Sequence, residues 1–266
     1  MMSLRTCPSF SLTFSPSNKQ VKKLSPSFKP YNQSPPSRSS IKMSSISTNH
    51  SQGVEHIVLF KVKENTESSK VNAMVNELQS LVTIEQVRHL TVGPLQQNNK
   101  ITSTTIPFSD LSYTHLFHSR YDSTEDLQTY IDHPNHLNVV RGFCFPICDN
   151  LFVVDWVAGD VALPPHPSPG TAFRVSFLKL KDEENSKLKE EVFRAVRGIK
   201  ESVGEVSYVS CGENITPARA KGFSIASLVV FPGRREMELV DPSEGLVKVK
   251  EHLESVVVVD YVVPLK

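Results

Sequence analysis

The chain has 266 residues, of which 39% are hydrophobic and 21% charged, with a formal net charge of +1. This composition is typical of a globular protein with one large core or two modest ones. Residues 1–54 hold seven Lys or Arg and no acid, which leaves 22 basic and 28 acidic residues in the body. An acidic body lacks the basic face that nucleic-acid binding requires, and no apolar run reaches membrane-spanning length, so we expect neither partner.

Residues 1–53 are rich in Ser and Pro and carry only positive charges. This composition cannot bury a core and is typical of an organelle transit peptide, so we expect a leader and a chloroplast location. A merely disordered tail is the alternative, and an internal start at Met43 would give a cytosolic form. The final residues Pro264-Leu265-Lys266 do not match the peroxisomal Ser-Lys-Leu signal.

The next hundred residues show a regular succession of elements. Residues 55–63 predict a strand, and apolar residues at three and four residue steps from Val71 to Val82 predict a helix. A short strand at 87–92 and a polar loop at 96–105 follow. The alternating, aromatic-rich segment 111–121 predicts a third strand.

A capping box, Ser123 to Asp126, then predicts a second helix, which Pro134 ends. Residues 151–157 predict the closing strand. Their order is βαββαβ.

The same order returns after a Pro-rich segment at 159–170, which has the composition of a stiff linker. Residues 177–181 echo 59–63, Gly212 echoes Gly93, and 256–262 echo 151–157. We therefore expect two ferredoxin-like βαββαβ units, at 54–158 and 171–264. Each sheet would have both helices on one face, so the other faces can cover each other in an α+β barrel. The copies would pair as an internal pseudo-dimer, or each with another chain in a homodimer.

Three cysteines lie in the body at Cys144, Cys148 and Cys211. Their number and spacing fit neither a disulfide framework nor a Cys-x-x-Cys redox motif, so we interpret them as small core residues.

Four segments carry a resemblance to a known family. They are His56 to Lys63, Tyr113 to His115, Tyr130-Ile-Asp-His-Pro-Asn-His136, and Val153 to Trp156. Through them the chain resembles the plant stress-responsive dimeric A/B barrel (Dabb) proteins, in the tandem form with a leader. Single-copy members are homodimers that enclose a cavity, and one plant member is a polyketide cyclase, olivetolic acid cyclase.

The resemblance implies a site in the first copy. Tyr130 and His136 match the cyclase's catalytic tyrosine and histidine, while His56 and His115 match pocket histidines, in an expected cavity between the sheets. Neutral imidazole can take an acidic proton from a poly-β-ketone while a phenol holds the carbonyl. His118 points away from His115 in the alternating strand, and we expect it to be solvated or at an interface.

Two other readings of these histidines remain open. His133 and His136 flank a proline at a helix end, where histidines commonly bond free carbonyls. His133-x-x-His136 also has a spacing compatible with zinc, but no further Cys or His stands at a recognisable distance.

The second copy departs from the cyclase pattern. Arg174 falls at the position of His56, Ile225 at that of His115 and Glu238 at that of Tyr130, while Asp241 and Glu244 replace His133 and His136. We expect cyclase-like chemistry only in the first copy.

The resemblance also implies a structural Mg²⁺ bound by the backbone carbonyls of Leu81, Ile84 and Val87, and no other cofactor. The leading hypothesis is a protein that binds a small apolar molecule or protects under stress, without established catalysis. The alternative is a polyketide-cyclase-like enzyme that uses Tyr130 and His136.

Overall fold

The computed structural model describes residues 53–96, 100–103, 112–158, 167–204 and 206–265. The predicted leader, apart from Gly53, and most of the predicted linker lie outside these residues. Within the described part, no helix is long and apolar enough to cross a membrane.

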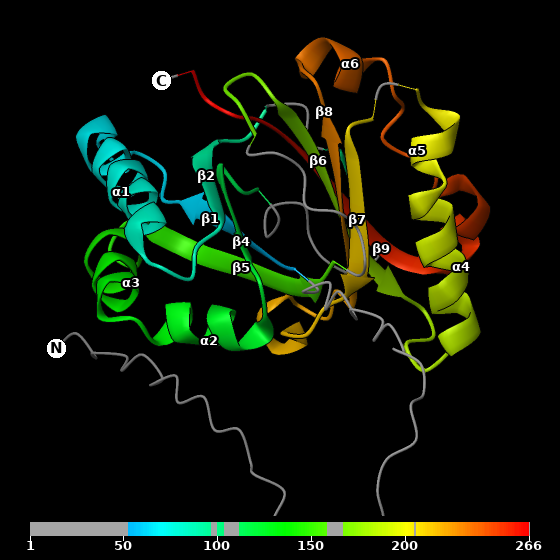
Figure 1. Ribbon diagram of the computed structural model, residues 1–266, viewed down its shortest axis with the longest axis horizontal. Helices are drawn as coiled ribbons and strands as arrows, with labels where there is room; N and C mark the ends of the chain where they lie inside the picture. Colours follow the sequence, from blue (N-terminus) through cyan, green and yellow to red (C-terminus); the bar gives the residue numbers. More distant parts are fainter. Residues whose placement is uncertain (1–52, 97–99, 104–111, 159–166, 205, 266) are drawn as a thin grey trace, which may run out of the picture. The chain divides into compact units, whose positions relative to one another are not determined.

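The first copy forms a four-stranded antiparallel sheet in the order β2-β4-β1-β5, with its helices on one face (Figure 1). Its strands are β1 (Val54–Val62), β2 (His89–Pro94), β4 (His115–Tyr121) and β5 (Cys148–Val157). Its helical segments are α1 (Ser68–Ser80), η1 (Leu81–Thr83), α2 (Thr124–Asp132), α3 (Pro134–Val139) and η3 (Val140–Cys144).

The second copy repeats this plan with the sheet order β7-β8-β6-β9. Its strands are β6 (Ala172–Leu180), β7 (Tyr208–Glu213), β8 (Ile225–Phe231) and β9 (Leu253–Val262). Its helical segments are α4 (Ser186–Arg197), α5 (Ile199–Ser202), η4 (Pro217–Arg219), α6 (Arg234–Glu238) and η5 (Val247–His252). The predicted pair of ferredoxin-like units is thus confirmed.

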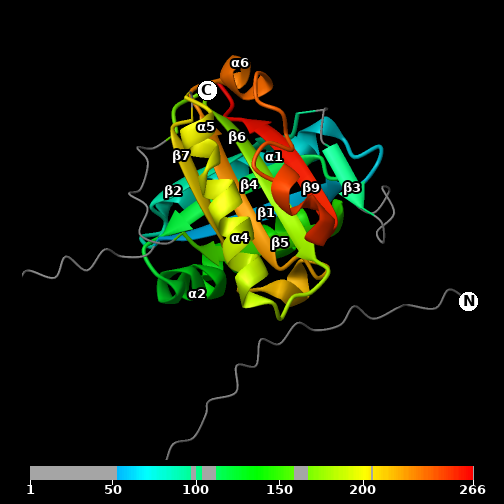
Figure 2. The same ribbon diagram turned by 90° about the vertical axis from the view of Figure 1, so that its right-hand side faces the viewer.

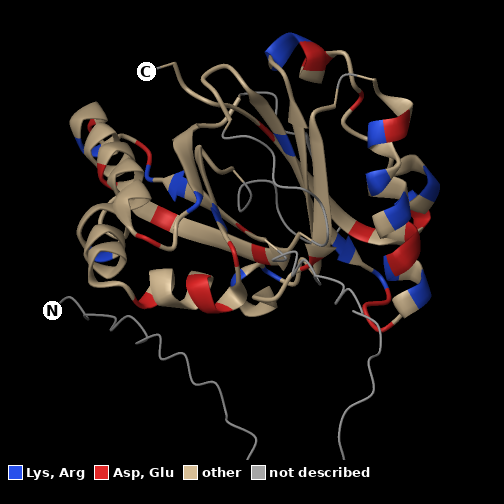
Figure 3. Ribbon diagram, in the orientation of Figure 1, with Lys and Arg blue, Asp and Glu red and all other residues tan. Residues whose placement is uncertain are grey.

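Local sequence sets the helix boundaries. The hydroxyl of Ser123 accepts the backbone N–H of Asp126 at 3.1 Å, as the predicted cap requires, and Asn185 caps α4 in the same way. Pro134 ends α2 as predicted. It also occupies the first turn of α3, a helix that was not predicted from the sequence. Helix α4 lies across the outer face of the second sheet (Figure 2), and its exposed side carries both signs of charge (Figure 3).

One prediction was wrong in part. The polar stretch 96–105 contains β3 (Lys100–Ser103), which pairs antiparallel with β9 and adds a fifth strand to the second sheet. Its sequence, Lys-Ile-Thr-Ser, has no strong apolar alternation. An edge strand takes its hydrogen bonds from the neighbouring strand, so the partner sheet decides its structure.

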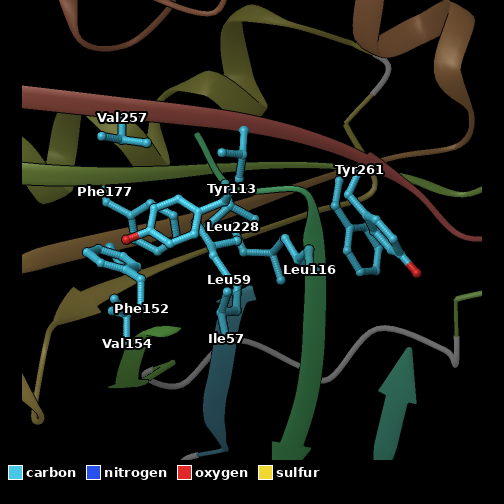
Figure 4. Close-up of a cluster of buried hydrophobic side chains, with 14 of the residues drawn as sticks. Ile57, Leu59, Tyr113, Leu116, Phe152, Val154, Phe177, Leu228, Val257 and Tyr261 are labelled. Carbon is cyan, nitrogen blue, oxygen red and sulfur yellow. The ribbon is translucent and has the colours of Figure 1, made fainter. Parts of the chain in front are cut away.

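The faces of the two sheets that carry no helices pack against each other. On β1, Ile57 and Leu59 point into this space, whereas Val58 and Phe60 point to the helices, as the alternation of a strand requires. Phe152 of the first copy lies 4.9 Å from the ring of Phe177 of the second, at the centre of a shared core (Figure 4). The two copies therefore pair within one chain.

Two matching seams join the sheet edges. At one, the backbone N–H of Gln96 donates to the carbonyl of Asp260; at the other, Ile215 donates to Asp155, at 2.9 and 2.8 Å. A Cβ at Gly212 would lie 2.8 Å from the carbonyl of Val157, and one at Gly93 would lie 2.8 Å from Pro264. The glycine shared by both copies is therefore explained by the close approach of the opposite copy, through the end of β5 at Gly212 and the residues just after β9 at Gly93.

Side chains reinforce both seams in the same way. The indole N–H of Trp156 donates to the hydroxyl of Ser210 at 2.8 Å, and Tyr261 shares a hydrogen bond of 2.6 Å with Thr91. In each case the aromatic residue comes from a last strand and the hydroxyl residue from the other copy. This pseudo-symmetry supports the internal pseudo-dimer.

A buried polar cluster also crosses between the copies. The carboxylate of Glu55 accepts from His118 Nε2 at 2.6 Å, from Arg120 at 3.0 Å and from the hydroxyl of Tyr208 at 3.1 Å. Burial opposes ionisation of Glu55, but these donors hold its pKa below its ordinary value. His118 is 2% exposed, so of the two predicted environments the interface is correct.

Candidate functional site

Three of the four predicted site residues come together on the helix-facing side of the first sheet. The ring of Tyr130 lies 4.6 Å from that of His136 and 6.1 Å from that of His56. Tyr121 and Phe117, which belong to the core under the helices, surround His56 on the sheet. The predicted location between the sheets was therefore wrong. His56 lies on the same face of β1 as Val58, which packs against the helices, and not on the face of Ile57.

His56 forms a buried pair with a carboxylate. Its Nδ1 lies 2.5 Å from Oδ1 of Asp155, its cross-strand neighbour on β5, and both side chains are almost fully buried. The other carboxylate oxygen, Oδ2, accepts the hydroxyl of Thr216 at 2.8 Å. The pair fixes the orientation of the His56 ring against Tyr130.

Tyr130 is the innermost residue of α2 and is 1% exposed. Burial raises the pKa of its phenol far above the ordinary value, and burial does the same for Tyr121, whose ring lies 5.1 Å away. Tyr121 in turn shares a hydrogen bond of 2.8 Å with the hydroxyl of Ser119. Tyr130 therefore keeps its proton near neutral pH and can donate a hydrogen bond.

His136, on α3, is half-buried beside Tyr130. Its Nδ1–H donates to the backbone carbonyl of Ile131 at 2.9 Å, which leaves the lone pair on Nε2. Burial is the main reason that its pKa is lowered to about 4; the charges of His56 and Arg219 act in the same direction, and the bond to Ile131 opposes them. His136 is therefore a neutral base at physiological pH, and it also bonds a carbonyl at the helix end, as the alternative reading predicted.

The lowered pKa of His136 predicts a pH dependence of stability. The unfolded chain takes up this proton near pH 6.5 and the folded chain only near pH 4, so stability falls as the pH drops through this window. We expect a loss of about 1–2 kcal/mol at pH 5, allowing for the partial exposure of the ring. Urea unfolding of wild type and His136→Gln at pH 7.5 and 5 measures it, since the variant lacks this part of the loss. Identical pH profiles would contradict the assignment.

His133 and His115 lie apart from the cluster. His133 caps α3, where its Nδ1 accepts the N–H of Asn135 at 3.2 Å. His115 pairs with Phe60 on β1, four residues from His56, or roughly 13 Å along the strand. It is half-buried, burial lowers its pKa, and it shares a hydrogen bond with Thr114. His115 lies on the same strand face as Phe117, whereas Tyr113 precedes the strand and packs between the sheets.

The second copy shows what this position becomes without the histidine. Arg174 stands opposite Asp260, as His56 stands opposite Asp155, and binds both of its carboxylate oxygens at 2.8 and 2.9 Å. It also donates to the carbonyl of Val240 at 2.6 Å. The position therefore holds a structural ion pair in one copy and an aromatic, imidazole-lined cluster in the other.

The tyrosine position of the second copy needs a correction. Gly233 is the N-cap residue of α6, as Ser123 is of α2, although it makes no side-chain cap; counting from these two residues makes Val240, not Glu238, the equivalent of Tyr130. Glu238 is exposed and pairs with Arg234. The prediction had aligned Pro242 with Pro134. Because α6 is shorter than α2, this alignment assigned Glu238 to the position of Tyr130.

The sequence reading missed two residues that hold the cluster. Asp155 could have been identified from the sequence, because both copies repeat the closing Val-Val-Asp segment. No sequence pattern indicates Thr216, since only the seam between the copies brings it to Asp155.

The predicted magnesium ligands lie at the turn after α1. The carbonyl of Leu81 accepts the N–H of Ile84 at 3.1 Å, and that of Ile84 accepts the N–H of Val87 at 2.9 Å. Each of these two carbonyl oxygens keeps a second lone pair, which could bind a hard cation such as Mg²⁺. The magnesium site stays a prediction.

Two other chemistries find no support in the described part of the chain. No cluster of three or more His, Cys, Asp or Glu residues able to hold a metal occurs there. Burial raises the pKa of Cys144 to about 12 and those of Cys148 and Cys211 to about 11, so these thiols stay protonated. All three are buried and unpaired, as predicted for core residues.

Comparisons with known proteins identify the family. The model of the stress responsive A/B barrel domain matches residues 54–158 and 172–263. Two stress-response A/B barrel domain-containing proteins of Arabidopsis thaliana are similar. One is 42% identical over 232 residues, covering 85% of each chain, and the other is 36% identical over 214 residues, covering 79% of this chain and 97% of its own. A crystal structure of a monooxygenase-like protein from Fusobacterium nucleatum is 12% identical, with a TM-score of 0.53 over 80% of this chain and 93% of that chain, and shares the fold alone. The chain therefore belongs to the stress-responsive A/B barrel domain family, with two copies of the domain in tandem.

Proposed function

We propose that the first copy binds a small, largely apolar molecule beside Tyr130 and His136, and that the second copy serves as its structural partner. The observation that carries this proposal is the difference between the copies at one position. An ion pair occupies it in the second copy, whereas in the first copy the ring of His56 lies near the phenol of Tyr130, which in turn lies beside the imidazole of His136. The apolar neighbours Phe117 and Leu127 would bind the body of the ligand.

The two polar residues would give the ligand its orientation. Tyr130 keeps a proton to donate to a carbonyl or hydroxyl oxygen, and His136 Nε2 has a lone pair to accept from a hydroxyl. A phenol or an enolised dicarbonyl compound offers both groups. This chemistry defines the panel of compounds with which binding is measured.

Binding is tested by the shift in melting temperature across a panel of phenolic and dicarbonyl compounds. We expect a compound that stabilises the wild type to lose at least about tenfold in affinity in Tyr130→Phe and His136→Gln, since each removes one hydrogen bond to the ligand. The matched control is His133→Asn, which removes a histidine three residues away but keeps the helix cap. Equal loss in the control, or none in the two variants, would sink the proposal.

A cyclase-like reaction is the second candidate. One observation favours it: the ring centroids of a neutral imidazole and a protonated phenol lie 4.6 Å apart, so a general base and a hydrogen-bond donor stand side by side. Purified protein is expected to turn over a poly-β-ketone, and His136→Gln to lower the rate by about 10²-fold or more, while His133→Asn leaves it unchanged. Absence of turnover by the wild type across such substrates removes this candidate and leaves binding.

A further inference from the structure

The segment 214–219, between β7 and β8, crosses from the second copy to the site of the first. In Figure 1 it runs, in gold, below the end of β5, which it contacts. The backbone N–H of Ile215 donates to the carbonyl of Asp155 at 2.8 Å. Just beyond the segment, the buried ring of Phe223 packs 5.6 Å from that of Phe152. Both ends of this crossing segment are therefore fixed against the first copy.

Within the crossing segment, the Thr216 hydroxyl has two acceptors within reach, Asn214 Oδ1 at 3.1 Å and, closer, Asp155 Oδ2. The backbone N–H of Thr216 and that of Asp155 both donate to Oδ1 of Asn214, at 2.9 and 3.3 Å, which sets Thr216 and Asp155 side by side. The Thr216 hydroxyl then lies 2.8 Å from Asp155 Oδ2, the oxygen that His56 leaves open. In the second copy Arg174 binds both oxygens alone. In the first copy, the second oxygen of the Asp155 carboxylate therefore receives its hydrogen bond from a residue of the other copy.

Arg219 ends η4, three residues after Thr216, and its side chain is exposed. Among the described residues, no hydrogen bond or ion pair neutralises its guanidinium. Its charge acts on His136, whose pKa it helps to lower. Arg219 therefore belongs to the short helix η4, which packs against β5 of the first copy, and among the described residues its charge has no counter-ion.

We infer that the second copy forms one wall of the first copy's site, in which Thr216 positions the His56–Asp155 pair and Arg219 selects ligands that carry a carboxylate. The inference deepens the proposed function and rests on it for the ligand. A carboxylate matches the planar donors of a guanidinium, while the neutral imidazole and the phenol contribute no competing negative charge. Thr216 acts through Asp155 and is a positioning residue.

The role of Thr216 is tested in the full-length protein by NMR of histidine-labelled samples. We expect Thr216→Val, which removes the hydroxyl and keeps the shape, to move the Nδ1–H resonance of His56, and Thr216→Ser, which restores the hydroxyl, to return it. A purely structural threonine would leave the resonance in place in a folded Thr216→Val protein. That result would overturn the positioning role.

The role of Arg219 is tested with a matched pair of probes, para-hydroxybenzoate and its methyl ester. We expect Arg219→Gln to weaken binding of the acid about tenfold and to change binding of the ester less than about twofold, since only the acid carries charge. The same variant is expected to raise the pKa of His136 above about 4 only in small part, because burial remains its main cause; NMR titration without ligand measures this change. Arg235→Gln, an exposed arginine of the same copy, is the control and changes neither.

The outcomes separate the two proposals. An unchanged titration of His136 in Arg219→Gln would overturn the placement of Arg219 at the site, whatever binds. Binding of both probes to the wild type, with equal affinities in Arg219→Gln, would overturn carboxylate selection and leave the binding function intact. If the wild type binds neither probe and no panel compound, the binding function falls, and carboxylate selection falls with it.

Discussion

Glu55→Gln is expected to destabilise the protein by about 3–5 kcal/mol, because it removes a carboxylate that neutralises Arg120 between the sheets. Glu55 is fully buried and Arg120 is 4% exposed, so water cannot replace the lost charge. Gln still reaches His118 or Tyr208 with its amide, but it leaves a buried guanidinium uncompensated. Chemical denaturation in urea at pH 7.5 measures the change.

Two controls separate the ion pair from the loss of a hydrogen bond. Tyr208→Phe removes one donor to Glu55 and one acceptor of Arg120 but no charge, so we expect a smaller loss of about 1–2 kcal/mol. Glu251→Gln changes an exposed carboxylate in the same chemical way and is expected to have almost no effect. If Glu55→Gln costs no more than Tyr208→Phe, the cluster is hydrated and the argument from burial fails. The wild type also loses this contribution as the pH falls below the ordinary pKa of a carboxyl group, because the pKa of Glu55 is lower in the folded state.

Arg174→Gln is expected to cost about 3 kcal/mol, because both oxygens of Asp260 and the carbonyl of Val240 lose their donors at once. The corresponding change in the first copy, His56→Gln, is expected to cost less. Asp155 keeps the hydroxyl of Thr216, and the Gln amide can still donate to it. Urea unfolding of the two variants compares the same strand position in two environments.

The control for Arg174 is Arg234→Gln, an arginine of the same copy in an exposed pair with Glu238, for which we expect a change within about 0.5 kcal/mol. An Arg174→Gln effect no larger than this would show that the ion pair contributes no stability. An effect of His56→Gln as large as that of Arg174→Gln would show that the first copy uses its histidine for structure alone. That second result would weaken the binding proposal, which depends on the difference between the copies.

The order of elements could be predicted because local signals carry it. The alternation of β1, the spacing of apolar residues in α1 and the Ser123 cap each belong to one short segment, and the return of the strand and helix patterns after the linker revealed the repeat. Segments whose partners lie elsewhere in the chain were harder. Strand β3 exists because β9 offers it an edge, and no property of its four residues indicates this.

For the site, the sequence by itself determined which residue types are present: Tyr130, His136 and His56 in the first copy and Arg174 in the second. The tertiary structure decided their use. Strand parity placed His56 under the helices and not between the sheets, and burial made His136 a neutral base. Only the seam between the copies brought Thr216 to Asp155, because a contact between residues 61 positions apart depends on how two sheets close on each other, and no local sequence pattern records that closure.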